Sequence, residues 1–310
     1  MSRPVRVLAI GMVVLIVLGP VLPQWALFLL TVAFGKGLVV LGLLLLMRAG
    51  LVPFGQGLYY CLGGYAVGLG GKFLQMSDAF VLLALGLAVT SLVALVLGAL
   101  LSRYRDIFFA MLSLAFSMIL YGILVKSQVL GSTDGFNVAQ PTFVGLALSQ
   151  EQTRLAVFVL AALLVLGATA LLDAYLATPL GRLAAAIRDN EIRVEYMGAS
   201  VQRALLVKQV IAATLAGAGG ALTAIAVGHV DPEMSYWTTS GEFVFVAVLS
   251  GTGSVLAPII GSVLFEALRS FATEHAPNVW QMILGIALLA TIMFLPRGMW
   301  SLLQRRRVGS

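Results

Sequence analysis

The feature that most constrains this chain is a series of apolar runs, each long enough to cross a bilayer as a helix. A transmembrane helix needs roughly 17 to 25 predominantly apolar residues. Runs of this kind lie near residues 5–22, 25–47, 58–76, 79–101, 107–130, 154–176, 204–229, 241–271 and 279–296. With 60% hydrophobic and only 10% charged residues, a soluble domain could not cover its apolar side chains. The sequence therefore predicts one all-α, polytopic membrane domain over residues 1–310, with about 8–10 transmembrane helices.

Basic residues indicate the orientation, because loops rich in Lys and Arg stay on the cytoplasmic side. With the N-terminus in the cytoplasm, the inward-facing segments are 1–6, 48–57, 102–106, 177–208 and the tail from Arg297. They hold fourteen of the nineteen Lys and Arg residues, and the outward-facing segments hold none. Both termini are therefore predicted to be cytoplasmic. The basic, apolar start could pass for a signal peptide, but Pro20 and Pro23 follow it in place of a small-residue cleavage site, which favours a first span.

The same charge pattern predicts an interruption in the run 241–271. A single crossing there would carry the basic tail, Arg305 to Arg307, to the outside. The run is therefore expected to enter and return, with a break at SGTGS, Ser250 to Ser254. A similar break, RAGLVPFGQG, joins the second and third spans. Paired breaks at membrane depth are typical of a transport path, and close packing through small residues is the alternative.

One charged stretch stands between two apolar runs: TPLGRLAAAIRDNEIRVEYMG, Thr178 to Gly198. Pro179 suits the first turn of a helix, and Gly198 is a natural stop. We expect one short polar helix here, within a cytoplasmic loop over residues 177–203. Two pairs of opposite charge are spaced to meet along it: Asp189 with Arg193, and Arg188 with Glu191. The stretch is either a solvated linker or a surface that docks a partner.

Six segments, in order, resemble the membrane-spanning permease subunit of bacterial ABC importers for branched-chain amino acids, the M-type permease of the LIV system. They are RAGLVPFGQGLYYCLGGYAVGL, RYRDIFFAMLSLAFSMILYG, GSTDGFNV, GRLAAAIRDNEIRVEYMGAS, VLSGTGSVLAPIIGSVLFE and MFLPRGMW. The resemblance implies a multi-pass protein of the bacterial inner membrane. It also implies four kinds of partner: a second homologous permease subunit, two cytoplasmic ATPase subunits, a periplasmic substrate-binding protein and membrane lipid, with no nucleic acid.

By the same resemblance, residues 177–203, which contain the charged stretch, form a cytoplasmic coupling loop that connects the permease to its ATPases. The residues expected to do so are Arg188, Asp189, Asn190, Glu191, Arg193, Glu195 and Gly198. The chain departs from the family pattern at several positions, with Leu43, Gln56, Asp106, Arg193 and Val194 in place of the residues that many members carry. These departures leave the solute open among branched-chain amino acids, other small amino acids, urea and short amides.

The translocation path is expected to use the two breaks, the external TDG loop and one acidic residue. The candidates are Gly55, Gln56, Gly57, Thr133, Asp134, Gly135, Glu242, Gly251 and Gly253. Asp134 and Glu242 lie toward the outside, where either could meet a substrate ammonium or a basic residue of the binding protein.

Two other classes of protein remain to be weighed. The chain carries no G-x-x-x-x-G-K-[ST] motif, so its energy must come from a partner or, in the alternative, from an ion gradient. An ion-driven carrier places ionisable groups within its spans. The candidates are Lys36, Lys126, Asp173, Glu242, Glu266 and Arg269. Most are expected to reach a membrane edge, whereas Lys36, near mid-span, is expected to face another subunit or the pathway.

The third class, an intramembrane enzyme, finds little support. His229 and His275 stand apart without a paired histidine, and Cys61 is the single cysteine, in an apolar run. Capping or interfacial roles are expected for the two histidines. The chain is accordingly expected to have no catalytic residues, to hold no metal and to bind no cofactor itself, with ATP used by the partner subunits.

Overall fold

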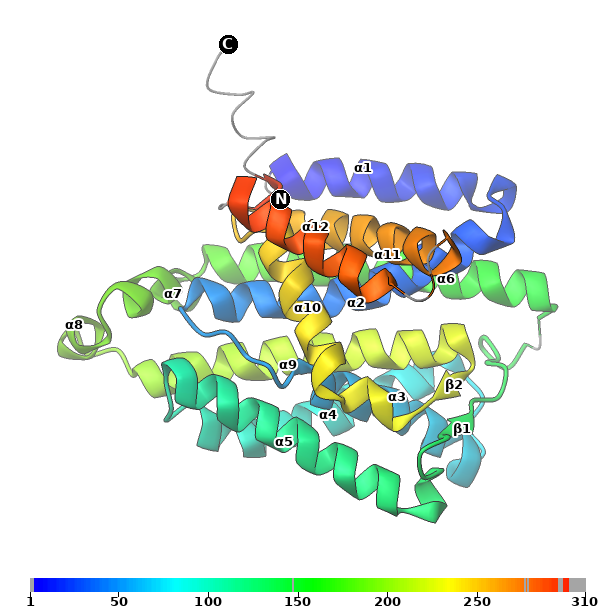
Figure 1. Ribbon diagram of the computed structural model, residues 1–310, viewed down its shortest axis with the longest axis horizontal. Coiled ribbons are helices and arrows are strands. Elements are labelled where there is room, and N and C mark those ends of the chain that lie inside the picture. Colours follow the sequence, from blue (N-terminus) through cyan, green and yellow to red (C-terminus); the bar gives the residue numbers. More distant parts are fainter. Residues whose placement is uncertain (1–2, 147, 276, 278, 295–297, 301–310) are drawn as a thin grey trace, which may run out of the picture.

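The computed structural model describes residues 3–146, 148–275, 277, 279–294 and 298–300. These residues form a helical bundle with one pair of two-residue strands (Figure 1). The helices are α1 (Arg3–Leu18), α2 (Gln24–Arg48), α3 (Gln56–Leu74), α4 (Ala79–Leu101), α5 (Asp106–Lys126), α6 (Gln150–Ala177), α7 (Pro179–Asp189), α8 (Glu191–Tyr196), α9 (Val201–Val227), α10 (Trp237–Ser250), α11 (Ala257–His275) and α12 (Trp280–Phe294). Short 3-10 turns are η1 (Gly19–Val21), η2 (Gln128–Leu130) and η3 (Pro232–Ser235), and the strands are β1 (Phe136–Asn137) and β2 (His229–Val230).

Each predicted span contains helix among its described residues, which confirms the polytopic helical fold class. Among the described residues, five helices are long and apolar enough to cross a membrane: α2, α4, α5, α6 and α9. The remaining predicted spans form helices that are shorter or less apolar. In α3, for example, six glycines, Gln56 and Lys72 lower the hydropathy of a 19-residue helix. The tail with Arg297 and Arg305 to Arg307 lies outside the described residues.

The centre of the bundle is built on α2 and α9. In their most apolar 18-residue windows, 83% and 67% of the residues are buried, against 28% in α4 and 22% in α5. A helix that is apolar on all sides, such as α2, must be surrounded by other helices or lipid. Small residues let α2 and α9 approach closely, since a Cβ at Gly42 would lie 2.9 Å from the Cα of Ala212. The small residues of these two central helices therefore allow close packing.

The bundle has two distinct ends (Figure 1). At one, α7 and α8 project beyond the long helices, and we call it the α7–α8 end. At the other, β1 pairs antiparallel with β2, and Thr142 bonds through its backbone to Ser77 and Ala79, which joins the 131–146 loop to the turn between α3 and α4. This second end is the β1–β2 end.

The predicted interruption of 241–271 is confirmed: α10 ends at Ser250 and α11 begins at Ala257. The chain runs from the β1–β2 end along α10 and turns back along α11 (Figure 1). A contact fixes the position of the turn, because Arg48, the last residue of α2, donates to the carbonyl of Thr252. The turn therefore lies at the α7–α8 end of the bundle.

Candidate coupling and translocation sites

The charged stretch forms two helices, so the prediction of one continuous helix is wrong. Thr178 Oγ1 accepts a hydrogen bond from the Gly181 N–H (3.2 Å), and Pro179 occupies the first position of α7, as its sequence indicates. Asn190 then adopts an extended backbone (φ −163°, ψ 103°), and its Oδ1 accepts from the Arg193 N–H at 2.9 Å to start α8. Asn side chains favour this capping role over a helix interior. Gly198, at φ +83°, ends the segment as expected.

The two intrahelical ion pairs expected here are absent from the ion pairs of the described residues. The break at Asn190 separates their partners onto different helices. Glu191 instead accepts from Arg105 Nε at 2.6 Å, and the Arg105 Nη1 donates to the carbonyl of Ser102 at 2.6 Å. Glu191 thus attaches α8 to the turn between α4 and α5.

Two further contacts attach α7 to the bundle. Lys208 of α9, completely buried, donates from Nζ to the carbonyl of Leu180 at 2.9 Å. Arg188 lies against the chain after α2, since a Cβ at Gly50 would be 3.3 Å from its Cγ. The buried apolar face of the two helices, with Ala184, Ile187 and Val194, joins a cluster that includes residues of α2, α4, α5 and α9. The loop is therefore a built part of the fold, not a free linker.

The outward face of α8 carries apolar side chains that the sequence prediction missed. Ile192 is 66% exposed, Tyr196 is 88% exposed and Met197, directly after α8, is 67% exposed, with charged residues between them. Five of the predicted coupling side chains share this exposure: Arg188, Asp189, Asn190, Arg193 and Glu195. The alternation of charged and apolar residues in EIRVEYM could have indicated these exposed side chains. Of its apolar residues, only Val194 is buried in the fold. This mixed surface suits a protein partner.

The first break, residues 49–55, leads the chain into the bundle before α3 begins (Figure 1). The Phe54 N–H donates to Ser113 Oγ at 3.1 Å, and a Cβ at Gly55 would lie 2.9 Å from the carbonyl carbon of Ser113. The Gly57 N–H donates to Ser240 Oγ of α10 at 3.0 Å. Gln56 is fully buried, and neither amide atom has a hydrogen-bond partner among the described residues. This break is a tight junction of α3, α5 and α10.

The second break, residues 251–256, turns at Gly251, which has φ +79° and ψ 163°. Arg48 Nε and Nη2 donate to the Thr252 carbonyl at 3.1 and 2.9 Å. A cavity of about 350 Å³ lies here, lined by Gly50, Arg188, Gly251 and Thr252 among others. Gly253 is exposed. The two breaks therefore meet each other and α7 at the α7–α8 end.

The TDG loop lies at the opposite end. Thr133 and Asp134 are exposed, with Thr133 Oγ1 3.1 Å from Asp134 Oδ1, and Gly135 packs against the backbone of Val230. Nearby, Asp78 caps α4 and accepts from the Val144 N–H at 2.7 Å. Slight desolvation raises the pKa of Asp78. The hydrogen bonds that its carboxylate accepts from the Val144 N–H and other backbone N–H groups have the larger, opposite effect, so the pKa lies below its ordinary value. The predicted path residues thus fall in separate places and form no single site.

Charged side chains within the spans do meet. Lys36 contacts Glu266 at 2.8 Å and Glu242 at 3.7 Å, and Glu242 accepts from Arg269 at 2.9 Å. The expectation that Glu242, Glu266 and Arg269 extend separately toward a membrane edge is wrong. Opposite charges in a low-dielectric interior attract one another strongly, and pairing removes the need to reach water.

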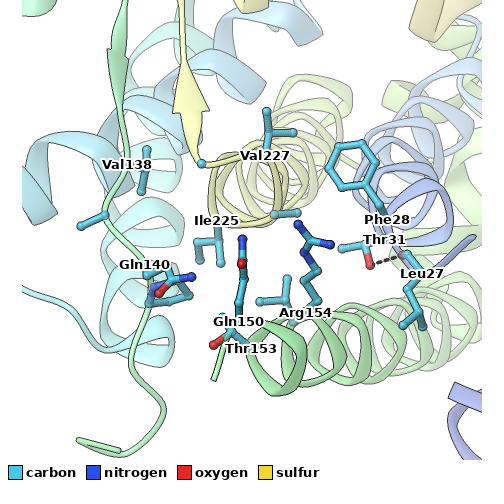
Figure 2. A pocket seen from close by; sticks show the side chains of 15 residues that line it. Leu27, Phe28, Thr31, Val138, Gln140, Gln150, Thr153, Arg154, Ile225 and Val227 are labelled. Atoms are coloured by element: carbon cyan, nitrogen blue, oxygen red, sulfur yellow. Dashed lines mark hydrogen bonds between the residues drawn. The ribbon is translucent and has the colours of Figure 1, made fainter. Parts of the chain in front are cut away.

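A half-polar cavity of about 190 Å³ opens at the β1–β2 end between α2, α6 and α9 (Figure 2). Gln150 and Arg154 rise from α6 into it, opposite Phe28 and Val227 (Figure 2). None of the predicted path residues lines it. The two histidines make local contacts elsewhere, His229 with Asn137 and His275 with the carbonyl of Phe271.

Comparison with known proteins agrees with the helical architecture. The family model described as branched-chain amino acid transport system, permease component, matches residues 25–292. The chain is similar to the high-affinity branched-chain amino acid transport system permease protein LivM of Salmonella typhimurium strain LT2 and of Escherichia coli strain K12. It is 27% identical to each over 292 residues, which cover 86% of this chain and 67% of each relative. No solved structure matches the chain. The chain belongs to the family of permease components of branched-chain amino acid transport systems.

Proposed function

We propose that this chain is the permease subunit of an ABC importer in the bacterial inner membrane, and that it moves branched-chain amino acids, or a related small amino acid or amide, into the cytoplasm. The family and the two LivM relatives support the solute class. Separate ATPase subunits supply the energy, and each docks on an α7–α8 loop. The chain binds no nucleotide cofactor of its own and catalyses no reaction.

The outward face of α8 is the observation that carries this proposal. Ile192, Tyr196 and Met197 expose apolar surface on a loop that is anchored and otherwise charged. Apolar side chains exposed together outside the apolar spans are favourable only when something covers them. The surrounding Asp189, Arg193 and Glu195 provide both signs of charge at the rim, as protein interfaces commonly do.

The anchors of the loop give a route from docking to transport. A displacement of α8 pulls on the α4–α5 turn through Glu191 and Arg105, and a displacement of α7 pulls on α9 through Leu180 and Lys208. Arg188 lies beside the chain after α2. Closure of the ATPases would therefore tilt central and peripheral helices together, which is how a rigid-body gate opens.

The remaining partners follow from the two ends of the bundle. With the α7–α8 end in the cytoplasm, the β1–β2 end with the TDG loop faces the periplasmic substrate-binding protein. A second homologous permease subunit completes the pathway. Labelling tests this orientation: Thr133→Cys should react with a membrane-impermeant maleimide in intact spheroplasts, and Tyr196→Cys only after lysis. The reverse pattern would overturn the orientation. Cys61 is buried and gives little background.

Charged substitutions on α8 test the docking itself. Ile192→Asp combined with Tyr196→Asp should abolish co-purification of the ATPase while the permease stays in the membrane at its normal level. Leu146→Asp is the matched control, because Leu146 is 66% exposed at the β1–β2 end. It should retain the ATPase. A full complex with wild-type uptake in the double variant would refute the docking and favour a carrier driven by an ion gradient.

A further inference from the structure

Four charged side chains inside the spans form one compact group at the level of the midpoint of α2. Lys36 is the midpoint of α2, Glu242 lies in α10, and Glu266 and Arg269 lie in α11. Their contacts run in a chain: Glu266 to Lys36 at 2.8 Å, Lys36 to Glu242 at 3.7 Å, and Glu242 to Arg269 at 2.9 Å. We call these four residues the charge cluster.

The cluster has two cations and two anions, and hence no net charge. Charges at membrane depth are expensive and are kept where they serve a function. A single bound ion would leave the cluster with an unbalanced charge in a medium of low dielectric constant, which is strongly unfavourable. A zwitterion adds no net charge. It can exchange one existing ion pair for two new ones, its ammonium with a carboxylate and its carboxylate with a cation.

The cluster is not equally buried throughout. The side chains of Lys36 and Glu266 are 11% and 15% exposed, whereas those of Glu242 and Arg269 are 19% and 33% exposed. Glu242 and Arg269 thus form the accessible half, and Lys36 and Glu266 form a deeper half that stays paired. The Arg269 guanidinium also lies 5.2 Å from the Trp280 ring, which covers one side of it. Its planar fork is well suited to a carboxylate.

The position of the accessible half fits a path. Glu242 lies in the first half of α10, beside the midpoint of α2, and α10 ends at the turn of Gly251 near the α7–α8 end. A solute that moves along α10 would therefore pass the cluster between the two ends of the bundle.

We propose that Glu242 and Arg269 form the permease's own recognition site for the zwitterionic backbone of an α-amino acid. Glu242 receives the ammonium and Arg269 the carboxylate, while Lys36 and Glu266 hold Glu242 in place and keep the site neutral. This proposal rests on the importer function given above and specifies where the permease discriminates its solute.

The decisive variant removes both accessible charges together, Glu242→Gln with Arg269→Gln. Removing one partner leaves a buried charge unpaired and tends to unfold the protein, whereas neutralising both is often tolerated. The complete complex, reconstituted in vesicles with its binding protein, should then assemble normally and hydrolyse ATP when the binding protein is added. Uptake of leucine should fall about tenfold or more, because two charge-assisted contacts to the solute are lost. Lys126→Gln, which removes a charge elsewhere in a span, should transport like the wild type.

The outcomes of this experiment distinguish a recognition site from a structural contact, and both from a failure of the importer function. Wild-type leucine uptake by the double variant would overturn the recognition site while the importer function stands. Failure of the double variant to assemble would also overturn it, because the pair would then be a structural or subunit contact. Absence of amino-acid uptake by the unmodified complex would refute the importer function itself. Normal assembly and ATP hydrolysis with lost uptake is the result that we expect.

Discussion

The two breaks in the helical pattern read alike in sequence and differ in structure. Residues 49–55 contain two constrained glycines: Gly50 has a left-handed backbone (φ +82°), and Gly55 has no room for a side chain because the backbone of Ser113 lies against it. In residues 251–256, the glycine that matters is Gly251, whose backbone conformation other residues rarely adopt. The first break therefore depends on both packing and backbone conformation, and the second on the backbone conformation of Gly251.

The two breaks also share a contact that neither sequence segment reveals. Arg48, at the start of the first break, donates twice to the carbonyl of Thr252 in the second. Arg188 of α7 lines the cavity beside Gly50 and Gly251. Segments about two hundred positions apart are thus connected to each other and to the coupling loop. This comparison suggests that the breaks respond to α7 as one unit.

The largest effect on stability is expected when Gly55, which packs against the backbone of Ser113, is substituted. Gly55→Ala forces the backbone of α5 to move, and overpacking of this kind costs up to about 3 kcal/mol of folding free energy, or more where backbone must shift. The fall in the unfolding temperature of the purified protein in detergent measures this loss of stability. Gly122→Ala in α5 is the control, because nothing lies within 4 Å of a Cβ there. Equal stability of the two variants would contradict the packing role.

A smaller effect is expected when Gly251, the glycine with positive φ in the second break, is substituted. Gly251→Ala places a side chain at φ +79° and ψ 163°, at an expected cost of about 1–3 kcal/mol. Uptake should fall while the complex still assembles. The sequence analysis named both Gly251 and Gly253 as candidates for the translocation path, but Gly253 is exposed, so Gly253→Leu should transport nearly normally. If Gly253→Leu blocked uptake and Gly251→Ala did not, the turn would have been assigned to the wrong residue.

The smallest effect is expected at the contact between the breaks. Arg48→Lys keeps the charge but cannot reproduce two donors from one planar group, so about 0.5–1.5 kcal/mol of coupling is lost. Fewer solute molecules should be imported per ATP hydrolysed, by a few-fold, with assembly unchanged. An unchanged ratio would show that the two breaks act independently. The ratio needs parallel measurements of uptake and phosphate release in the same vesicles.

The sequence predicted the spans well because transmembrane length and hydropathy are local properties. It also predicted the second break, because an unbroken run would have moved the basic tail across the membrane. The sequence did not predict ion pairs whose partners lie far apart along the chain. Glu191 was expected to pair with Arg188, three residues away, but Arg105 competes for it from another helix. Likewise, nothing local to Glu242, Glu266 or Arg269 indicates that Lys36 lies between them.

Capping by Asn190 explains why the charged stretch forms two helices and not the single helix that was predicted. Asn190 occurs within a sequence of good helix formers, so a continuous helix was a reasonable prediction from propensity. The apolar cluster around Ile187 and Val194 holds α7 and α8 separately against the bundle, and Asn190 can then cap the second helix. In α8, exposed Ile192 and Tyr196 and buried Val194 all alternate with charged residues, so the local sequence does not distinguish the exposed apolar residues from the buried one.

Photo-crosslinking from α8 tests the docking of the ATPase most directly. A benzophenone amino acid in place of Tyr196, which is 88% exposed, should form an adduct with the ATPase subunit when membranes that contain the whole complex are irradiated. The same probe in place of Phe73, 58% exposed at the β1–β2 end, should form none with the ATPase. An ATPase adduct from Tyr196 alone is the expected result. No ATPase adduct from Tyr196 in an assembled, transporting complex would contradict the coupling role of α7 and α8.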